Sequence, residues 1–137
     1  MTFTARQPED LNEVVTWLLK NRPQGGIILL QGDLGVGKTA LVKRFCLMSG
    51  ATEATSPTFS LYHRYPGQPT IHHYDLYMRD LSDFLVLGLF ETLEEEGFHF
   101  IEWADDAMKR RLEAYGMEYL TITIRVEDTI RIVEVIP

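Results

Sequence analysis

Residues 32–39 read Gly-Asp-Leu-Gly-Val-Gly-Lys-Thr and match the pattern G-x-x-x-x-G-K-[ST] at every fixed position. This pattern is the phosphate-binding P-loop, whose framing glycines permit backbone angles and a close approach that a Cβ atom would forbid. The amides between them hold phosphate oxygens, helped by the N-terminus of the helix that follows. The sequence therefore predicts a chain that binds a nucleoside triphosphate.

The loop also predicts individual roles. Lys38 is expected to reach the β- and γ-phosphates, and the hydroxyl of Thr39 to hold Mg²⁺. The predicted nucleotide contacts in this segment are Asp33, Leu34, Gly35, Val36, Gly37, Lys38, Thr39 and Ala40. The alternative interpretation is a glycine-rich turn that binds no ligand.

The residues around the loop favour the first interpretation, because a P-loop needs a strand before it and a helix after it. Residues 27–30 form a short apolar run of the kind expected in a buried strand. After the loop, Leu41, Phe45 and Met48 recur at helical spacing and predict one buried face.

Composition sets the broad class of the protein. The chain has 137 residues, of which 45% are hydrophobic and 24% charged, as in ordinary globular proteins, so we expect one domain over residues 1–137. No apolar run approaches the roughly 20 residues that span a bilayer, and the N-terminus lacks the apolar region of a secretory signal. The lone cysteine, Cys46, suits a reducing compartment, so we expect a cytoplasmic protein that does not bind membranes.

The net charge of −7 argues against a domain that grips nucleic acid by itself, because phosphate contacts need clustered lysines and arginines. The basic run at residues 109–111 follows two aspartates and reads most simply as a solvated helix face. We therefore expect no DNA binding, and contact with RNA only through a partner.

Hydrophobic periodicity predicts the remaining elements. They are a helix at 11–19, strands at 60–65 and 70–74 joined by a turn at 66–69, a helix at 81–96 broken near Gly88, a buried strand at 98–101, a helix at 105–114, and strands at 119–126 and 130–136. Because strands alternate with helices up to residue 114, the predicted fold is α/β and P-loop NTPase-like. Its central sheet is expected to be mainly parallel, with helices on both faces and antiparallel edge strands.

Two acidic residues are candidates for completing the site. Glu102 closes the strand at 98–101, where P-loop enzymes usually carry a carboxylate for the Mg²⁺ shell; the alternative is an acid that caps the next helix. Asp75 ends the strand at 70–74 and is expected near the metal or the attacking water; the alternative is an Asx turn.

Further polar residues are more ambiguous. His72 and His73 are adjacent on a predicted strand and face opposite ways, so they would not bind one metal together, although one of them could line the site. Thr58 lies beyond the P-loop in a Ser-Pro-Thr-Phe segment, where many NTPases carry a threonine loop that senses the γ-phosphate. A Ser-Pro pair is also typical of a plain turn.

Four segments together resemble the bacterial TsaE (YjeE) family in order and approximate spacing. They are the P-loop at 32–39, Thr-Ser-Pro-Thr-Phe at 55–59, His-Tyr-Asp-Leu-Tyr at 73–77 and Ile-Glu-Trp at 101–103. The resemblance implies a small Mg-dependent ATPase, weak without partners, that acts with TsaD and TsaB in the threonylcarbamoyladenosine modification of tRNAs reading codons that begin with A. Its cofactors would be ATP and Mg²⁺, and tRNA would be reached only through the partners.

The resemblance also implies roles for single residues. Lys38, Asp75 and Glu102 would be catalytic, with Lys38 on phosphate, Asp75 required for hydrolysis and Glu102 completing the metal site with Thr39. Thr58 would belong to a nucleotide-responsive loop. Trp103 would lie near the nucleotide, and its alternative is a core aromatic.

One departure from the family pattern concerns an arginine. The family often continues Asp-Leu-Tyr with Arg, whereas Met78 stands there in this chain and Arg79 follows one residue later. That displacement changes the facing side, so the family role is not assigned to Arg79. Two other functions remain open: a small-molecule P-loop kinase, and a nucleotide-gated binding module without useful catalysis.

Overall fold

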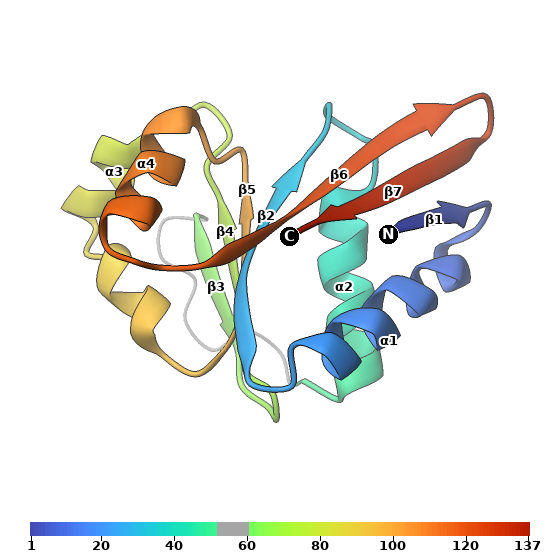
Figure 1. Cartoon of the computed structure of the whole chain (residues 1–137), viewed down its shortest axis with the longest axis horizontal. Helices are drawn as coiled ribbons and strands as arrows, with labels where there is room; N and C mark the ends of the chain where they lie inside the picture. Colours follow the sequence, from blue (N-terminus) through green and yellow to red (C-terminus); the bar gives the residue numbers. More distant parts are fainter. Residues whose placement is uncertain (52–60) are drawn as a thin grey trace.

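The computed structural model describes residues 1–51 and 61–137, and in these ranges the strands form a single seven-stranded sheet (Figure 1). The strands are β1 (Thr2–Ala5), β2 (Gly25–Gln31), β3 (Tyr62–Tyr65), β4 (Ile71–Asp75), β5 (Gly97–Glu102), β6 (Tyr119–Glu127) and β7 (Ile130–Ile136). Their spatial order is β1-β7-β6-β2-β5-β4-β3.

The centre of this sheet is parallel and its two sides are antiparallel. β2 pairs in parallel with β5 and β6, and β4 pairs in parallel with β5. β3 adds antiparallel to β4, while β7 and then β1 add antiparallel beyond β6. This arrangement confirms the predicted α/β class with antiparallel edges.

Helices cover both faces of the sheet. They are η1 (Pro8–Leu11), α1 (Asn12–Asn21), α2 (Lys38–Ser49), α3 (Leu81–Val86), η2 (Phe90–Glu94) and α4 (Asp106–Ala114). Figure 1 shows α1 and α2 on one face and α3 and α4 on the other. Within the described ranges, no helix combines the length and the apolar character that a membrane span requires.

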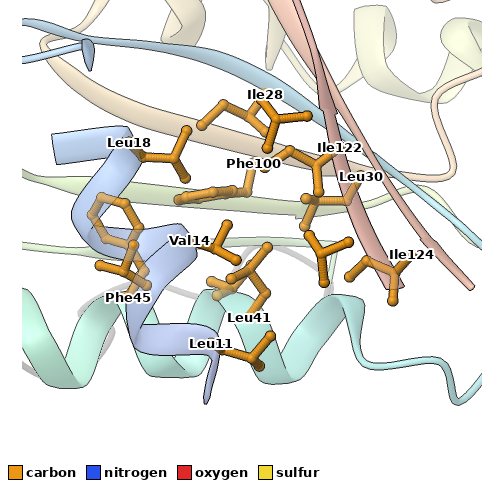
Figure 2. Packing of buried hydrophobic residues seen from close by; sticks show 14 of the residues in the cluster. Leu11, Val14, Leu18, Ile28, Leu30, Leu41, Phe45, Phe100, Ile122 and Ile124 are labelled. Atoms are coloured by element: carbon orange, nitrogen blue, oxygen red, sulfur yellow. The ribbon is translucent and has the colours of Figure 1, made fainter. Parts of the chain in front are cut away.

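The face under α1 and α2 is a continuous apolar core (Figure 2). Phe45 of α2 packs against Phe98 and Phe100 of β5, with ring centroids 4.7 and 5.2 Å apart. The predicted helical face of α2 is partly wrong, because Met48 is exposed. Near that end of the helix, Cys46 instead packs against the core and is partly buried.

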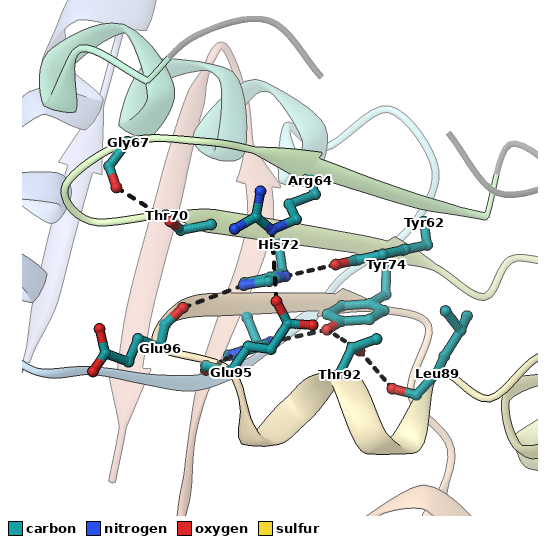
Figure 3. A network of polar contacts seen from close by, with 11 residues as sticks. Tyr62, Arg64, Gly67, Thr70, His72, Tyr74, Leu89, Thr92, Glu95 and Glu96 are labelled. Carbon is teal, nitrogen blue, oxygen red and sulfur yellow. Dashed lines mark hydrogen bonds and ion pairs between the residues drawn. The ribbon is translucent and has the colours of Figure 1, made fainter. Parts of the chain in front are cut away.

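The other face carries a second core, and this core contains a buried polar network (Figure 3). The His72 and His99 rings stack with centroids 4.1 Å apart. The hydroxyl of Tyr62 lies 2.7 Å from Nδ1 of His72, and the hydroxyl of Tyr74 lies 2.9 Å from Nδ1 of His99. Nε2 of His72 lies 3.3 Å from the carbonyl oxygen of Glu96, and Nε2 of His99 lies 2.8 Å from that of Glu95, so both nitrogens of each buried imidazole have partners inside the protein.

Most of the predicted elements lie where the sequence places them. The helix predicted at 81–96 is divided into α3 and η2, with Gly88 in the left-handed region at φ +70° between them. The strands at 119–126 and 130–136 form the antiparallel pair β6–β7. β1 was not predicted, because four residues give too short an alternation to recognise.

Candidate functional site

The P-loop connects the end of β2 to the start of α2, at the edge of the sheet where the parallel strands have their carboxyl ends. The pairing of β2, β4 and β5 places Leu30, Asp75 and Glu102 side by side at this edge. In open α/β sheets this is the edge where ligands bind. A cleft of about 340 Å³ lies there, lined by Leu34, Gly35, Gly37, Lys38, Thr39, Ala40, Asp75, Tyr77, Glu102, Trp103 and Arg131.

The glycines of the loop are required by its surroundings. Gly32 has φ +147°, and a Cβ atom there would lie 2.5 Å from the carbonyl oxygen of Ile124 in β6. Gly37, at φ +116°, is the residue before α2, so the loop turns directly into the N-terminus of that helix. An N-terminus of this kind presents free amides and a positive dipole to an anion.

Lys38 is almost fully buried and folds back over its own loop. Its ammonium donates to the carbonyl oxygen of Gly32 at 2.6 Å and lies 3.5 Å from the ring centroid of Trp103. Burial lowers the pKa of Lys38, whereas the carboxylates of Glu102 and Asp75 oppose that effect. The site therefore holds a partly desolvated cation, the kind of group that gains most from an anionic ligand.

Glu102 connects the P-loop helix to β4. Its Oε2 accepts from the hydroxyl of Thr39 at 2.9 Å and from Nε2 of His73 at 2.5 Å. Burial would raise the pKa of Glu102, but the hydrogen bond and charge of His73, the Thr39 hydroxyl and the Lys38 ammonium together lower it. The buried acid is therefore kept as a carboxylate, with its acceptor atoms at the base of the cleft.

The alternative role considered for Glu102, capping the next helix, is wrong. Asp105 caps α4 instead, since its side chain accepts from the amide of Met108 at 2.9 Å. Glu102 is therefore not the N-cap of α4.

Asp75 forms the predicted Asx turn and also lies at the cleft. Its Oδ1 accepts from the amide of Tyr77 at 3.0 Å, which is the Asx turn that ends β4. The same residue lines the cleft beside Lys38. A carboxylate held by one oxygen in a turn still presents the other oxygen as an acceptor.

Trp103 forms a wall of the cleft rather than part of the core interior. It is only partly buried and adopts φ +65°, which is rare for a residue other than glycine. Its ring packs against Tyr77 with centroids 5.2 Å apart and lies beneath the Lys38 ammonium. This backbone conformation turns the indole toward the P-loop directly after β5 ends.

The remaining sequence candidates lie elsewhere. Thr58 and the rest of its segment fall outside the described residues. His72 lies in the buried network on the opposite face of the sheet from His73, as strand alternation predicts. Arg79 is exposed and follows Met78, which is 87% exposed at φ +60°.

Three larger hollows, of about 500, 510 and 360 Å³, do not contain this chemistry. The first two are lined by residues at the starts of parallel strands, such as Gly25 and Gly97, and the third by α1 and Phe3 of β1; none is lined by a predicted site residue. Volume alone would favour them, but the convergence of a buried lysine, a threonine hydroxyl and two carboxylates favours the smaller cleft.

One residue of the cleft could not be predicted from the sequence. Arg131 of β7 donates from Nε to the carbonyl oxygen of Val36 at 2.6 Å, across 95 residues of chain. In the sequence it is an isolated arginine in an alternating strand, and only the sheet order brings it to the P-loop.

Comparison with known proteins supplies independent information. Residues 5–133 match the family described as "Threonylcarbamoyl adenosine biosynthesis protein TsaE". The tRNA threonylcarbamoyladenosine biosynthesis protein TsaE of Treponema pallidum is 35% identical over 129 residues, which cover 92% of each chain. The protein of that name from Synechocystis is 47% identical over 73 residues, covering 50% of this chain and 46% of the relative.

A solved structure agrees with these relatives. The structure described as "Crystal structure of Bacillus subtilus YdiB" superimposes with a TM-score of 0.68 at 26% sequence identity. The match covers 97% of this chain and 82% of the other.

Proposed function

The chain belongs to the TsaE family, which acts in tRNA threonylcarbamoyladenosine biosynthesis, and on this premise we propose that it is the ATP-binding and ATP-hydrolysing subunit of that modification. We propose further that it works with TsaD and TsaB, turns over ATP slowly alone, and reaches tRNA only through these partners.

The observation that carries the proposal is the convergence of Lys38, Thr39 and Glu102 in one cleft at the carboxyl ends of the parallel strands. Each has the chemistry that a P-loop ATPase needs: a cation for phosphate, a hydroxyl, and a carboxylate within hydrogen-bond distance of that hydroxyl.

These residues also fit Mg²⁺. The Thr39 hydroxyl and a Glu102 carboxylate oxygen lie 2.9 Å apart, and oxygen atoms of this kind are the ligands that Mg²⁺ prefers. Across the described residues, no group of three or more His, Cys, Asp or Glu side chains could hold a metal ion. Mg²⁺ usually takes one or two protein ligands and completes its shell with phosphate oxygens and water. Bound there, the ion would neutralise charge on the phosphates.

The chain's own residues would divide the remaining work. The Lys38 ammonium would exchange the Gly32 carbonyl for phosphate oxygens, and with the loop amides it would stabilise the charge that spreads over the γ-phosphate. His73 would keep Glu102 in place by its hydrogen bond. Asp75, which lines the cleft, would orient the attacking water for in-line displacement.

The charge of the chain supports an indirect relation to tRNA. A net charge of −7 opposes a direct grip on a phosphate backbone, whose binding requires clustered cations. Hydrolysis would therefore reset the partner complex rather than modify the nucleotide of the tRNA.

The test is steady-state ATP hydrolysis by the chain alone and with TsaD and TsaB, using Lys38→Ala and the control Lys43→Ala. Lys43 is an exposed residue of the same helix. We expect low turnover alone, a clear rise with the partners, and loss of the rise in Lys38→Ala but not in Lys43→Ala. An ATP hydrolysis rate that does not change when TsaD and TsaB are added would refute the proposed role. Transfer of phosphate to a metabolite instead would identify a kinase.

A further inference from the structure

The C-terminal hairpin β6–β7 supports the P-loop at both of its ends. At the first end, the backbone of Ile124 in β6 leaves no room for a Cβ atom on Gly32. At the second end, Arg131 of β7 donates from Nε to the carbonyl oxygen of Val36, and a Cβ atom on Gly37 would lie 3.2 Å from that same nitrogen. The hairpin is therefore part of the wall of the cleft and fixes the path of the loop.

Most N–H groups of the Arg131 guanidinium make no hydrogen bond to the residues that the structure describes. An arginine carries five N–H groups, and Nε uses one of them on Val36. In the described part of the chain, no carboxylate pairs with Arg131 and no group accepts from its Nη atoms. Arg125, on the adjacent strand, differs: its guanidinium lies 3.0 Å from a carboxylate oxygen of Glu127 and 3.7 Å from one of Glu134. Among the residues that the structure describes, Arg131 is thus a half-buried cation without a counter-charge.

Arg131 also stands between two hollows. It lines the cleft that contains Lys38, and it lines a second hollow of about 180 Å³ that extends toward β1 and η1. The two hollows share Gly37, Ala40 and Arg131 in their walls, and the second contains none of the acidic side chains of the first. If the terminal phosphate of a nucleotide lies beside Lys38 and Glu102, its nucleoside must extend out of the cleft in another direction. The side of the cleft at Arg131 is adjacent to the second hollow, which offers space in that direction.

We infer that Arg131 binds the phosphate chain of the nucleotide on the nucleoside side of Lys38, while its Nε holds the P-loop in position. The inference rests on the proposed nucleotide-binding function. A guanidinium fork suits phosphate oxygens, because it offers parallel donors as well as charge.

This placement predicts a distinct kinetic signature. Phosphates on the nucleoside side are present in both ADP and ATP, and their charge changes little when the γ-phosphate is transferred. An interaction with them strengthens binding of substrate and transition state alike. Loss of Arg131 should therefore raise KM and Kd while leaving kcat nearly unchanged.

The experiment is calorimetric titration of ADP and of Mg·ATP into the full chain and into Arg131→Gln, Arg131→Lys and the control Arg125→Gln, with kcat measured for each. We expect Arg131→Gln to weaken ADP and ATP equally, by about 10- to 100-fold, as for loss of a hydrogen bond to a charged group. We expect kcat to stay within about threefold. Arg131→Lys, which keeps the charge without the fork, should bind more tightly than Arg131→Gln and less tightly than the unsubstituted chain.

Four outcomes would overturn the inference. An ADP affinity of Arg131→Gln equal to that of Arg125→Gln would do so while leaving the proposed function intact. A fall in kcat at unchanged Kd would assign Arg131 to the reaction itself instead. An unsubstituted chain that binds neither nucleotide would remove the proposed function and this inference together. Circular dichroism reports folding, and if Arg131→Gln is unfolded, an Arg131→Lys affinity equal to that of Arg125→Gln would refute the inference.

Discussion

Acidification is expected to destabilise this protein through His99, a buried histidine of β5. Its Nε2 lies 2.8 Å from the carbonyl oxygen of Glu95, and its ring stacks on His72. Because a carbonyl only accepts, Nε2 carries the hydrogen and Nδ1 accepts from Tyr74 in the neutral ring. Burial, reinforced by the neighbouring His72, lowers the pKa of His99 from 6.5 to about 4.

The sign and size of the effect follow from this pKa. A histidine whose pKa is lower in the folded state than in the unfolded state binds fewer protons when the protein is folded. The contribution of neutral His99 to the free energy of unfolding is therefore complete above pH 6.5 and is lost as the pH falls toward 4. At about 1.36 kcal/mol for each pH unit between those values, the full loss is roughly 3 kcal/mol. That is a large fraction of the 5–15 kcal/mol that typically stabilises a domain, on the order of a fifth or more.

The assay is urea unfolding of the wild type, His99→Gln and the control His63→Gln between about pH 7.5 and about pH 4.5. Carboxylates titrate in all three proteins, so their effects largely cancel when the free energy of unfolding of each variant is subtracted from that of the wild type. We expect the advantage of the wild type over His99→Gln to shrink by about 2.5 kcal/mol across this range. The change for His63→Gln should be smaller, since that ring is only partly buried. An advantage over His99→Gln that is constant with pH would refute the reasoning.

Three further substitutions test separate parts of the structure. Phe45→Ala should reduce the free energy of unfolding by about 3–5 kcal/mol in urea titrations, because two aromatic rings pack on Phe45. Gly32→Ala should lower the melting temperature and weaken nucleotide binding, since the new Cβ atom would meet the Ile124 carbonyl oxygen at 2.5 Å; normal values of both would show that the loop can shift. His73→Gln should raise the Mg²⁺ concentration for half-maximal ATP hydrolysis by about 10- to 100-fold, because Glu102 loses an orienting donor; an unchanged Mg²⁺ titration would contradict that role.

The sequence predicts the central architecture because its signals are local. The P-loop motif, the apolar strand before it and the alternating strands at the C-terminus each depend on neighbouring residues. The proximity of Asp75 and Glu102 was also predictable, since both end strands of a parallel sheet and such ends meet at one edge.

Other features depend on long-range placement and could not be predicted. Strand alternation separates His72 from His73 but does not say which of them faces α2. The contact of Arg131 with the P-loop depends on the order β7-β6-β2, which brings the C-terminal hairpin beside that loop. The left-handed backbone of Trp103 has no signature in a sequence.

The most direct test of the account is the affinity for Mg·ATP, measured by calorimetry on the wild type, Lys38→Ala and Lys43→Ala. The buried Lys38 ammonium donates to the P-loop carbonyl of Gly32 and is expected to bind phosphate instead when the nucleotide is present. Lys38→Ala should therefore lose about 10- to 100-fold or more in affinity, while Lys43→Ala matches the wild type. Equal affinities for all three proteins would contradict the claim that this cleft is the ATP site.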